Sequence, residues 1–184
     1  DFADAESMFM LREMLSRSGK PHSLSIDSDN PNVDLSQTNL LHLNRPIVDF
    51  ENADCIIMVG VDVKREAPLL SARIRKNYLY NSPLIMSVGP KWKSTFEYEH
   101  VGDDFTALSK ISDLTKYKKP IVLVSQRSLL FASGELVKFY KKHGNLNTIS
   151  VLNRVASRSA AIKLGYCQPP LPKCDINILL NADN

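Results

Sequence analysis

The sequence predicts an α/β fold: a doubly wound, mostly parallel sheet with helices on both faces. Three observations lead to this prediction. Short continuous apolar runs at residues 55–60, 84–88 and 121–125 have the pattern of strands that are buried on both faces. Segments with helical periodicity separate these runs. The length of 184 residues, of which 43% are hydrophobic, suits one globular domain with a sizeable core.

A helix is expected at the start of the chain. Residues 4–18 place Met8, Leu11 and Leu15 on one helical face, and Gly19 ends the pattern.

The following segment is rich in Ser, Asp and Asn. We expect a loop over residues 21–39, and either a short strand or an irregular lead-in over residues 40–43. The chain is therefore expected to have two parts, a lead-in helix and loop over residues 1–39 and an α/β domain segment over residues 40–184.

Two helices are expected between the first three strands. Residues 66–80 carry Leu70, Ile74 and Tyr78 at a spacing of four, and Pro68 lies in the first turn, where proline is tolerated. The second helix follows two acidic residues, which suit the positive end of a helix dipole. Its apolar residues recur at a spacing of three: Phe105, Leu108, Ile111 and Leu114.

The C-terminal third predicts two more helices and a last strand. The helices are expected over residues 134–142 and 148–164, the second ending at a left-handed Gly165. Residues 168–172 are proline-rich and predict a stiff extended connector, and residues 176–180 predict a strand. Because the chain opens on Asp rather than Met and stops soon after this strand, we expect a fragment, a split subunit, or a partner chain that completes the layer.

The charge balance and the short apolar runs exclude two broad classes. The 23 basic and 20 acidic residues give a net charge of +3, which is too even for a nucleic-acid-binding domain. No apolar run approaches the ~20 residues that a membrane-spanning helix needs. We therefore expect no nucleic-acid partner and no direct membrane span.

The cysteines predict neither a disulfide framework nor a metal cluster. Cys55 opens an apolar run and is expected to be a small buried hydrophobic residue. Cys167 and Cys174 flank the proline-rich connector, and no Cys-x-x-Cys pair occurs. Structural zinc and iron–sulfur clusters need four ligands, mostly in closely spaced pairs, so this segment cannot hold either alone. A reducing compartment is expected.

Three loops follow predicted strands and are the candidate ligand loops of such a sheet: residues 60–65, 89–92 and 125–127. The first leads into a helix, whose backbone N–H groups could cradle a phosphate. It has one glycine instead of a Gly-x-Gly-x-x-Gly array, and Asp62 would repel an anion. A tight strand-to-helix connection is therefore the favoured interpretation.

No catalytic constellation is visible in the residues. Residues 97–100 read Glu-Tyr-Glu-His and precede two aspartates, but alternation on a strand would separate His100 from the two glutamates. The other histidines lie in separate segments, and no nucleophile elbow, His-Glu-x-x-His motif or phosphate-binding loop occurs. We therefore assign no catalytic, cofactor-binding or metal-ligating residue.

Residues 53–76 resemble a known family. They read Ala-Asp-Cys-Ile-Ile-Met-Val-Gly-Val-Asp-Val-Lys-Arg-Glu-Ala-Pro-Leu-Leu-Ser-Ala-Arg-Ile-Arg-Lys. The large iron–sulfur subunit of respiratory complex I, the NADH-quinone oxidoreductase, has a similar pattern. There an apolar strand is followed by a Gly-Thr-Asn-Pro-Arg-like loop, Glu-Ala-Pro and a helix with Ala-Arg-Ile-Arg-Lys. Further islands of resemblance keep the family's order: residues 4–7, 98–103, 151–157, 164–165 and 181–183.

The resemblance implies a part of that large subunit, from its molybdopterin-oxidoreductase-like C-terminal region. In the family this region serves as a scaffold, while clusters bind to a Cys-rich N-terminal region. No cluster motif occurs here, so the chain itself is expected to carry no cofactor, with FMN and iron–sulfur clusters in partner chains. Asp62-Val63 replaces the family's Asn-Pro, which argues against a retained pterin nucleotide. Arg65, Arg73 and Arg75 match the family and are interpreted as structural or interface ion-pair residues.

The implied function is an accessory, non-catalytic part of proton-pumping NADH:ubiquinone oxidoreductase. The implied partners are other complex I subunits, above all the cluster-bearing part of the large subunit and the flavin-bearing NADH module. The implied place is the peripheral arm on the matrix side of the mitochondrial inner membrane, or the cytoplasmic face in a bacterium. Trp92, Tyr98 and residues 156–161 are candidates for packing contacts with these partners, and packing within the chain's own core is the favoured alternative. Two alternatives stay open: a fragment of a genuine molybdopterin-dependent oxidoreductase, and a free-standing nucleotide-binding domain.

Overall fold

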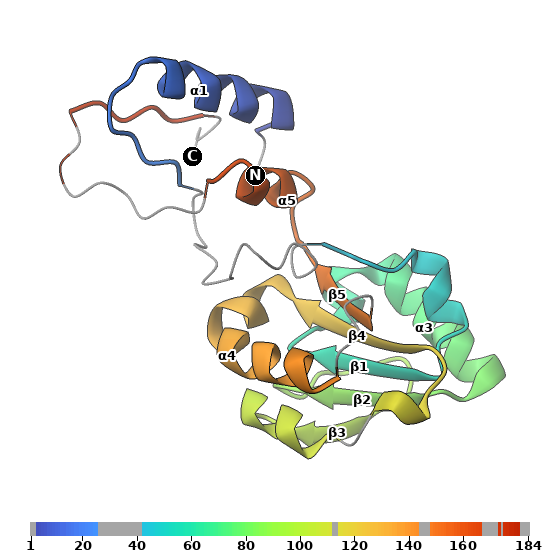
Figure 1. Cartoon of the computed structure of the whole chain (residues 1–184). Coiled ribbons are helices and arrows are strands. Elements are labelled where there is room, and N and C mark those ends of the chain that lie inside the picture. Colours follow the sequence, from blue (N-terminus) through green and yellow to red (C-terminus); the bar gives the residue numbers. More distant parts are fainter. Residues whose placement is uncertain are drawn as a thin grey trace. The chain divides into compact units, whose positions relative to one another are not determined.

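The chain has two compact units in the computed structural model, which describes residues 3–25, 42–111, 114–143, 148–166, 173 and 175–180. One unit is Gln37–Arg154, and the other joins the two ends of the chain, Asp1–Ser36 and Val155–Asn184 (Figure 1). The expected division at residues 39 and 40 places the C-terminal end in the α/β segment instead. That division stays a prediction.

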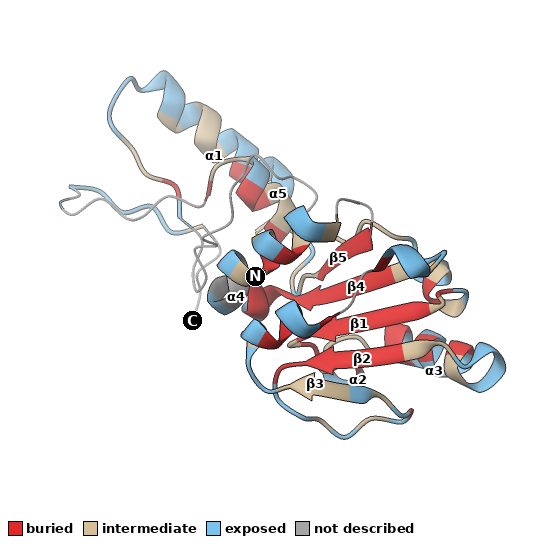
Figure 2. Ribbon diagram, turned by 60° about the horizontal axis from the view of Figure 1, so that its bottom comes forward, coloured by how far each residue is buried: buried red, intermediate tan, exposed pale blue. Residues whose placement is uncertain are grey.

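A five-stranded parallel sheet forms the centre of the larger unit, with strand order β3-β2-β1-β4-β5. The strands are β1 Cys55–Val59, β2 Leu84–Val88, β3 Glu99–Gly102, β4 Pro120–Ser125 and β5 Ile149–Leu152. In the middle of the sheet Ile57 lies between Met86 and Val122. Every residue of β1 is buried, so this strand is covered on both faces (Figure 2). The predicted α/β class and the three predicted central strands are confirmed.

Helices cover both faces of this sheet. The larger unit contains η2 Ile47–Glu51, α2 Val63–Glu66, α3 Pro68–Asn81, η3 Phe105–Lys110, η4 Leu114–Lys116 and α4 Gln126–His143, where η marks a 3₁₀ helix. From the centre of the sheet, the crossover through α3 runs from β1 to β2, and the crossover through α4 runs from β4 to β5 in the opposite direction. Because such crossovers are right-handed, α3 and α4 lie on opposite faces (Figure 1).

The core on the α3 side is built by alternate residues of three strands. Ile56, Ile85 and Leu123 are at most 3% exposed and pack with Leu70 and Ile74 of α3. These two α3 residues come from the predicted spacing of four, and Pro68 opens the helix as expected. The periodicity therefore identified the buried face of α3 correctly.

The residues before η2 run along the outer edge of β5. His42 O accepts a hydrogen bond from Val151 N at 3.0 Å, and Asn44 Nδ2 donates to Ile149 O at 2.6 Å. His42 and Leu43 form no strand, which agrees with the irregular lead-in, while residues 40 and 41 lie outside the described part. This segment occupies backbone groups of an edge strand that would otherwise be open to pairing.

Several predicted elements differ in the structure. The helix predicted over residues 148–164 is wrong in its first part, because this part forms β5; only Arg158–Lys163 is helical, as α5. Residues 176–180 form no strand. The helix predicted over 134–142 is the second half of the longer α4. Where a helix was expected after Asp104, the chain forms two 3₁₀ helices, η3 and η4. The edge strand β3 was not predicted.

The smaller unit contains α1 Ala5–Arg17, which confirms the first predicted helix. Asp4 Oδ1 caps it by accepting a hydrogen bond from Ser7 N at 2.8 Å. Met8 packs in a small core with Leu24, Ala161 and Tyr166, and the Tyr166 hydroxyl donates to Met8 O at 2.7 Å. Gly165, with φ of 89°, follows α5 in the predicted left-handed conformation.

Three sequence predictions lie outside the described residues: the cysteines at 167 and 174, the connector 168–172, and the segment 181–183. None of the described helices is both long and apolar enough to cross a bilayer.

Candidate functional site

The candidate site is the edge of the sheet where β1 and β4 end. The chain leaves β1 toward β2 and leaves β4 toward β5, so the crossovers diverge at this point. Folds of this kind bind ligands outside the carboxyl ends of the strands at such a switch point. Two of the three predicted loops, residues 60–65 and 125–127, flank it.

The loop after β1 is packed closely by the chain itself. Gly60 has φ of +59°, and its N–H donates to Val88 O at 2.7 Å. A Cβ at this position would overlap Ser128 Oγ and lie 3.2 Å from Phe105 Cε1. Ser128 Oγ also donates to Val59 O at 3.0 Å. The space above Gly60 is therefore already filled by α4 and η3.

The backbone donors of this loop are directed at the protein's own carboxylates. Asp62 N donates to Glu66 Oε1 at 3.0 Å, and Arg65 N donates to Asp62 Oδ1 at 3.3 Å. The second oxygen of Glu66 accepts a hydrogen bond from Ser125 Oγ at 3.0 Å. Glu66 thus links the helix after β1 to the end of β4. Its carboxylate accepts hydrogen bonds from donors that a bound anion could use. A phosphate here would meet two carboxylates and donors that are already used.

The loop after β4 has a similar structural role. Ser125 and Gln126 are at most 5% exposed, and Gln126 Oε1 accepts a hydrogen bond from Arg154 N at 3.0 Å. This contact ties the start of α4 to the chain beyond β5. Arg127, the third residue of the loop, is exposed. The loop at residues 125–127 therefore uses its buried polar side chains to join neighbouring strand ends.

The loop after β2, residues 89–92, contributes Trp92 to a cluster of aromatic rings. Trp92 stacks on Tyr98 with ring centroids 5.3 Å apart and meets Phe96 edge to face at 6.0 Å. The Tyr98 hydroxyl donates to Trp92 O at 2.8 Å and accepts from Trp92 N at 3.1 Å. Trp92 and Tyr98 pack against the core on the α3 side, as the core-packing alternative expects, and their contact with a partner stays a prediction.

Among the described residues, His100 and Cys55 are not part of a reactive group. His100 Nε2 lies 3.1 Å from Asp103 Oδ1, while Glu97 and Glu99 are exposed. Within the described ranges no three His, Cys, Asp or Glu side chains converge to hold a metal ion. Burial, with a smaller contribution from the Asp54 charge, raises the pKa of the Cys55 thiol to about 12. Cys55 is thus the buried residue that the sequence predicted.

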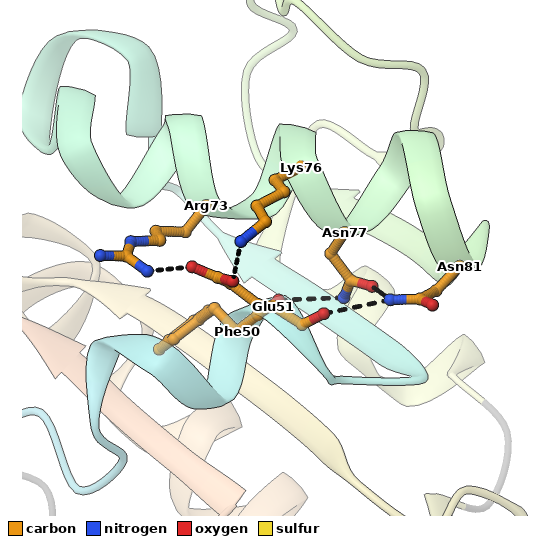
Figure 3. Close-up of polar contacts among 6 residues, drawn as sticks. All are labelled: Phe50, Glu51, Arg73, Lys76, Asn77 and Asn81. Carbon is orange, nitrogen blue, oxygen red and sulfur yellow. Dashed lines mark hydrogen bonds and ion pairs between the residues drawn. The ribbon is translucent and has the colours of Figure 1, made fainter.

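A second polar cluster lies between η2 and α3 (Figure 3). Arg73 Nη1 and Lys76 Nζ both pair with the carboxylate of Glu51, the lysine at 2.6 Å. Asn77 is 1% exposed, and its Nδ2 donates to Phe50 O at 2.9 Å and to Ala53 O at 2.8 Å. These contacts hold η2 against α3.

The three family-matching arginines differ in their contacts. Arg73 pairs with Glu51, and Arg65 Nε lies 3.6 Å from Asp62 Oδ2. Arg75 is exposed and makes no ion pair with the part of the chain that is described. Two of the three therefore act within the chain as structural ion-pair residues.

Sequence patterns do not point to the residues that close the switch point. Glu66, Ser125 and Ser128 were not singled out, and neither was Asn77. The one usable signal was a polar residue at a position that the periodicity places on a buried face, as Asn77 lies beside Ile74 on α3. Such a residue needs internal hydrogen-bond partners.

Comparison with known proteins gives the family. A family model described as Molybdopterin oxidoreductase matches residues 1–176. The chain belongs to the molybdopterin oxidoreductase family. One similar curated protein is the NADH-ubiquinone oxidoreductase 75 kDa subunit of Reclinomonas americana. It is 30% identical over 88% of this chain and 28% of its own length. The mitochondrial NADH-ubiquinone oxidoreductase 78 kDa subunit of Neurospora crassa is 32% identical over 90% of this chain and 25% of its own length. The 78 kDa subunit of Candida albicans is 31% identical over 89% of this chain and 25% of its own length.

These relatives confirm the resemblance to the large subunit of complex I. The chain spans about a quarter of the length of the curated relatives it matches. The match runs along nearly all of this molybdopterin oxidoreductase chain, so it covers both units of the structure.

The described residues do not fit a pterin nucleotide at the switch point. In this molybdopterin oxidoreductase chain two of the loop N–H groups, those of Asp62 and Arg65, donate to the carboxylates of Glu66 and Asp62, and Gly60 N donates to Val88 O. Ser128 and Phe105 fill the space over Gly60, where a bound group would approach the backbone. The carboxylates of Asp62 and Glu66 both lie at the loop that would receive the anion, and the nearby cation of Arg65 is paired with Asp62.

Proposed function

We propose that this chain is a structural portion of the large iron–sulfur subunit of proton-pumping NADH:ubiquinone oxidoreductase. In this role it scaffolds electron transfer from NADH to quinone and carries no cluster itself. One observation carries the proposal: about 30% identity to 75 and 78 kDa subunits runs colinearly over about nine-tenths of the chain. The closed switch point supports the scaffold role.

The proposed partners and place follow from the same relatives. The chain would pack against the cluster-bearing part of the large subunit and near the flavin-bearing NADH module, in the peripheral arm on the matrix side of the mitochondrial inner membrane. FMN and iron–sulfur clusters would belong to those partner chains. The names of two relatives include a mitochondrial origin, which supports the proposed compartment.

Native purification tests this proposal. The chain is tagged in its own cells, purified in mild detergent, and the co-purifying proteins are identified by mass spectrometry. We expect flavin- and cluster-bearing subunits at equal stoichiometry, together with NADH:quinone activity of the assembly. A chain that purifies alone as a monomer would contradict the proposal.

A second candidate is a fragment of a genuine molybdopterin-dependent oxidoreductase, which membership of the family favours. Metal analysis of the purified assembly separates the two. The scaffold proposal expects iron without molybdenum in the assembly. Molybdenum at one atom per chain would overturn it in favour of the second candidate.

A further inference from the structure

We draw no further inference here: the strongest candidate, the apolar hollow that Leu43, Ile47, Ala67 and Leu152 line beside the exposed Leu69 at the start of α3, carries none, because nothing in the structure shows what covers it.

Discussion

Gly60 leaves no room for a side chain at the switch point. Its φ of +59° lies in the left-handed region, and Ser128 and Phe105 crowd its α-carbon. Gly134, in contrast, lies in α4 with no atom within 4 Å of an added Cβ. The two glycines therefore respond in opposite directions to the same substitution.

We expect Gly60→Ala to lower the free energy of unfolding by roughly 2–4 kcal/mol, from backbone strain and overpacking together. Gly134→Ala, the matched control, is expected to raise it by about 0.5–1 kcal/mol, because alanine restricts the unfolded chain. Urea denaturation followed by circular dichroism measures both. A Gly60→Ala variant as stable as the wild type would show that the crowding over Gly60 is absent in solution.

Glu51 gives the fold a pH dependence. A hydrogen bond from Lys76, and a smaller contribution from one with Arg73, hold the pKa of this carboxyl below its ordinary value near 4.5. A carboxyl whose pKa is lower in the folded than in the unfolded chain stabilises the fold above its unfolded pKa. This stabilisation is lost as the pH falls through the folded pKa.

We therefore expect Glu51→Gln to lower the urea midpoint at about pH 7, and this difference from the wild type to shrink as the pH falls below 4.5 and through the folded pKa. High salt should reduce the difference at neutral pH, because the paired side chains are partly exposed. Glu97→Gln, at an exposed carboxylate without an ion pair in the described part, is the control. A difference that persists at the acidic pH would contradict the ion-pair origin.

At the scale of elements, Asn77 fastens η2 to α3. Its amide donates to Phe50 O near the end of η2 (Figure 3). It also donates to Ala53 O, just before β1. Both carbonyl groups lie in residues that are at most 1% exposed. Asn81, one turn further, donates to Glu51 O and to Asn77 Oδ1 and is exposed.

We expect Asn77→Ala to destabilise the chain by about 2–4 kcal/mol, because it leaves two buried carbonyl oxygens without a donor. Asn81→Ala is expected to cost less than about 1 kcal/mol, since water replaces its contacts. Hydrogen exchange should show faster opening of η2 in Asn77→Ala, while the β1 amides stay protected. Equal costs for the two variants would argue against a special role of the buried amide.

At the scale of the whole molecule, the unit Gln37–Arg154 contains all five strands and the core that α3 covers. We therefore expect a segment of these residues to unfold in one cooperative transition when it is expressed alone. Circular dichroism and tryptophan fluorescence, which reports on Trp92, should give the same midpoint. Non-coincident or gradual transitions would show that the ends of the chain are needed for folding.

How much the sequence predicted depended on where each strand lies in the sheet. β1, β2 and β4 are the inner strands, and burial on both faces made them continuous apolar runs. β3 and β5 are edge strands. Glu99–Gly102 is polar and partly exposed. Ile149–Leu152 precedes a segment with helical spacing, so local periodicity predicts one long helix there. These two segments are strands because their backbones pair with β2 and β4.

The sequence by itself determined the α/β class, the inner strands, the buried face of α3 and the unfavourable charge of Asp62 at the first loop. These features follow from local periodicity and from the chemistry of single residues. Only the tertiary structure decided how the switch point closes. Glu66 and Ser125 are 59 residues apart, and they meet because β1 and β4 pair in parallel and end at the same edge. Contacts between strand ends depend on the strand order, which no local pattern contains.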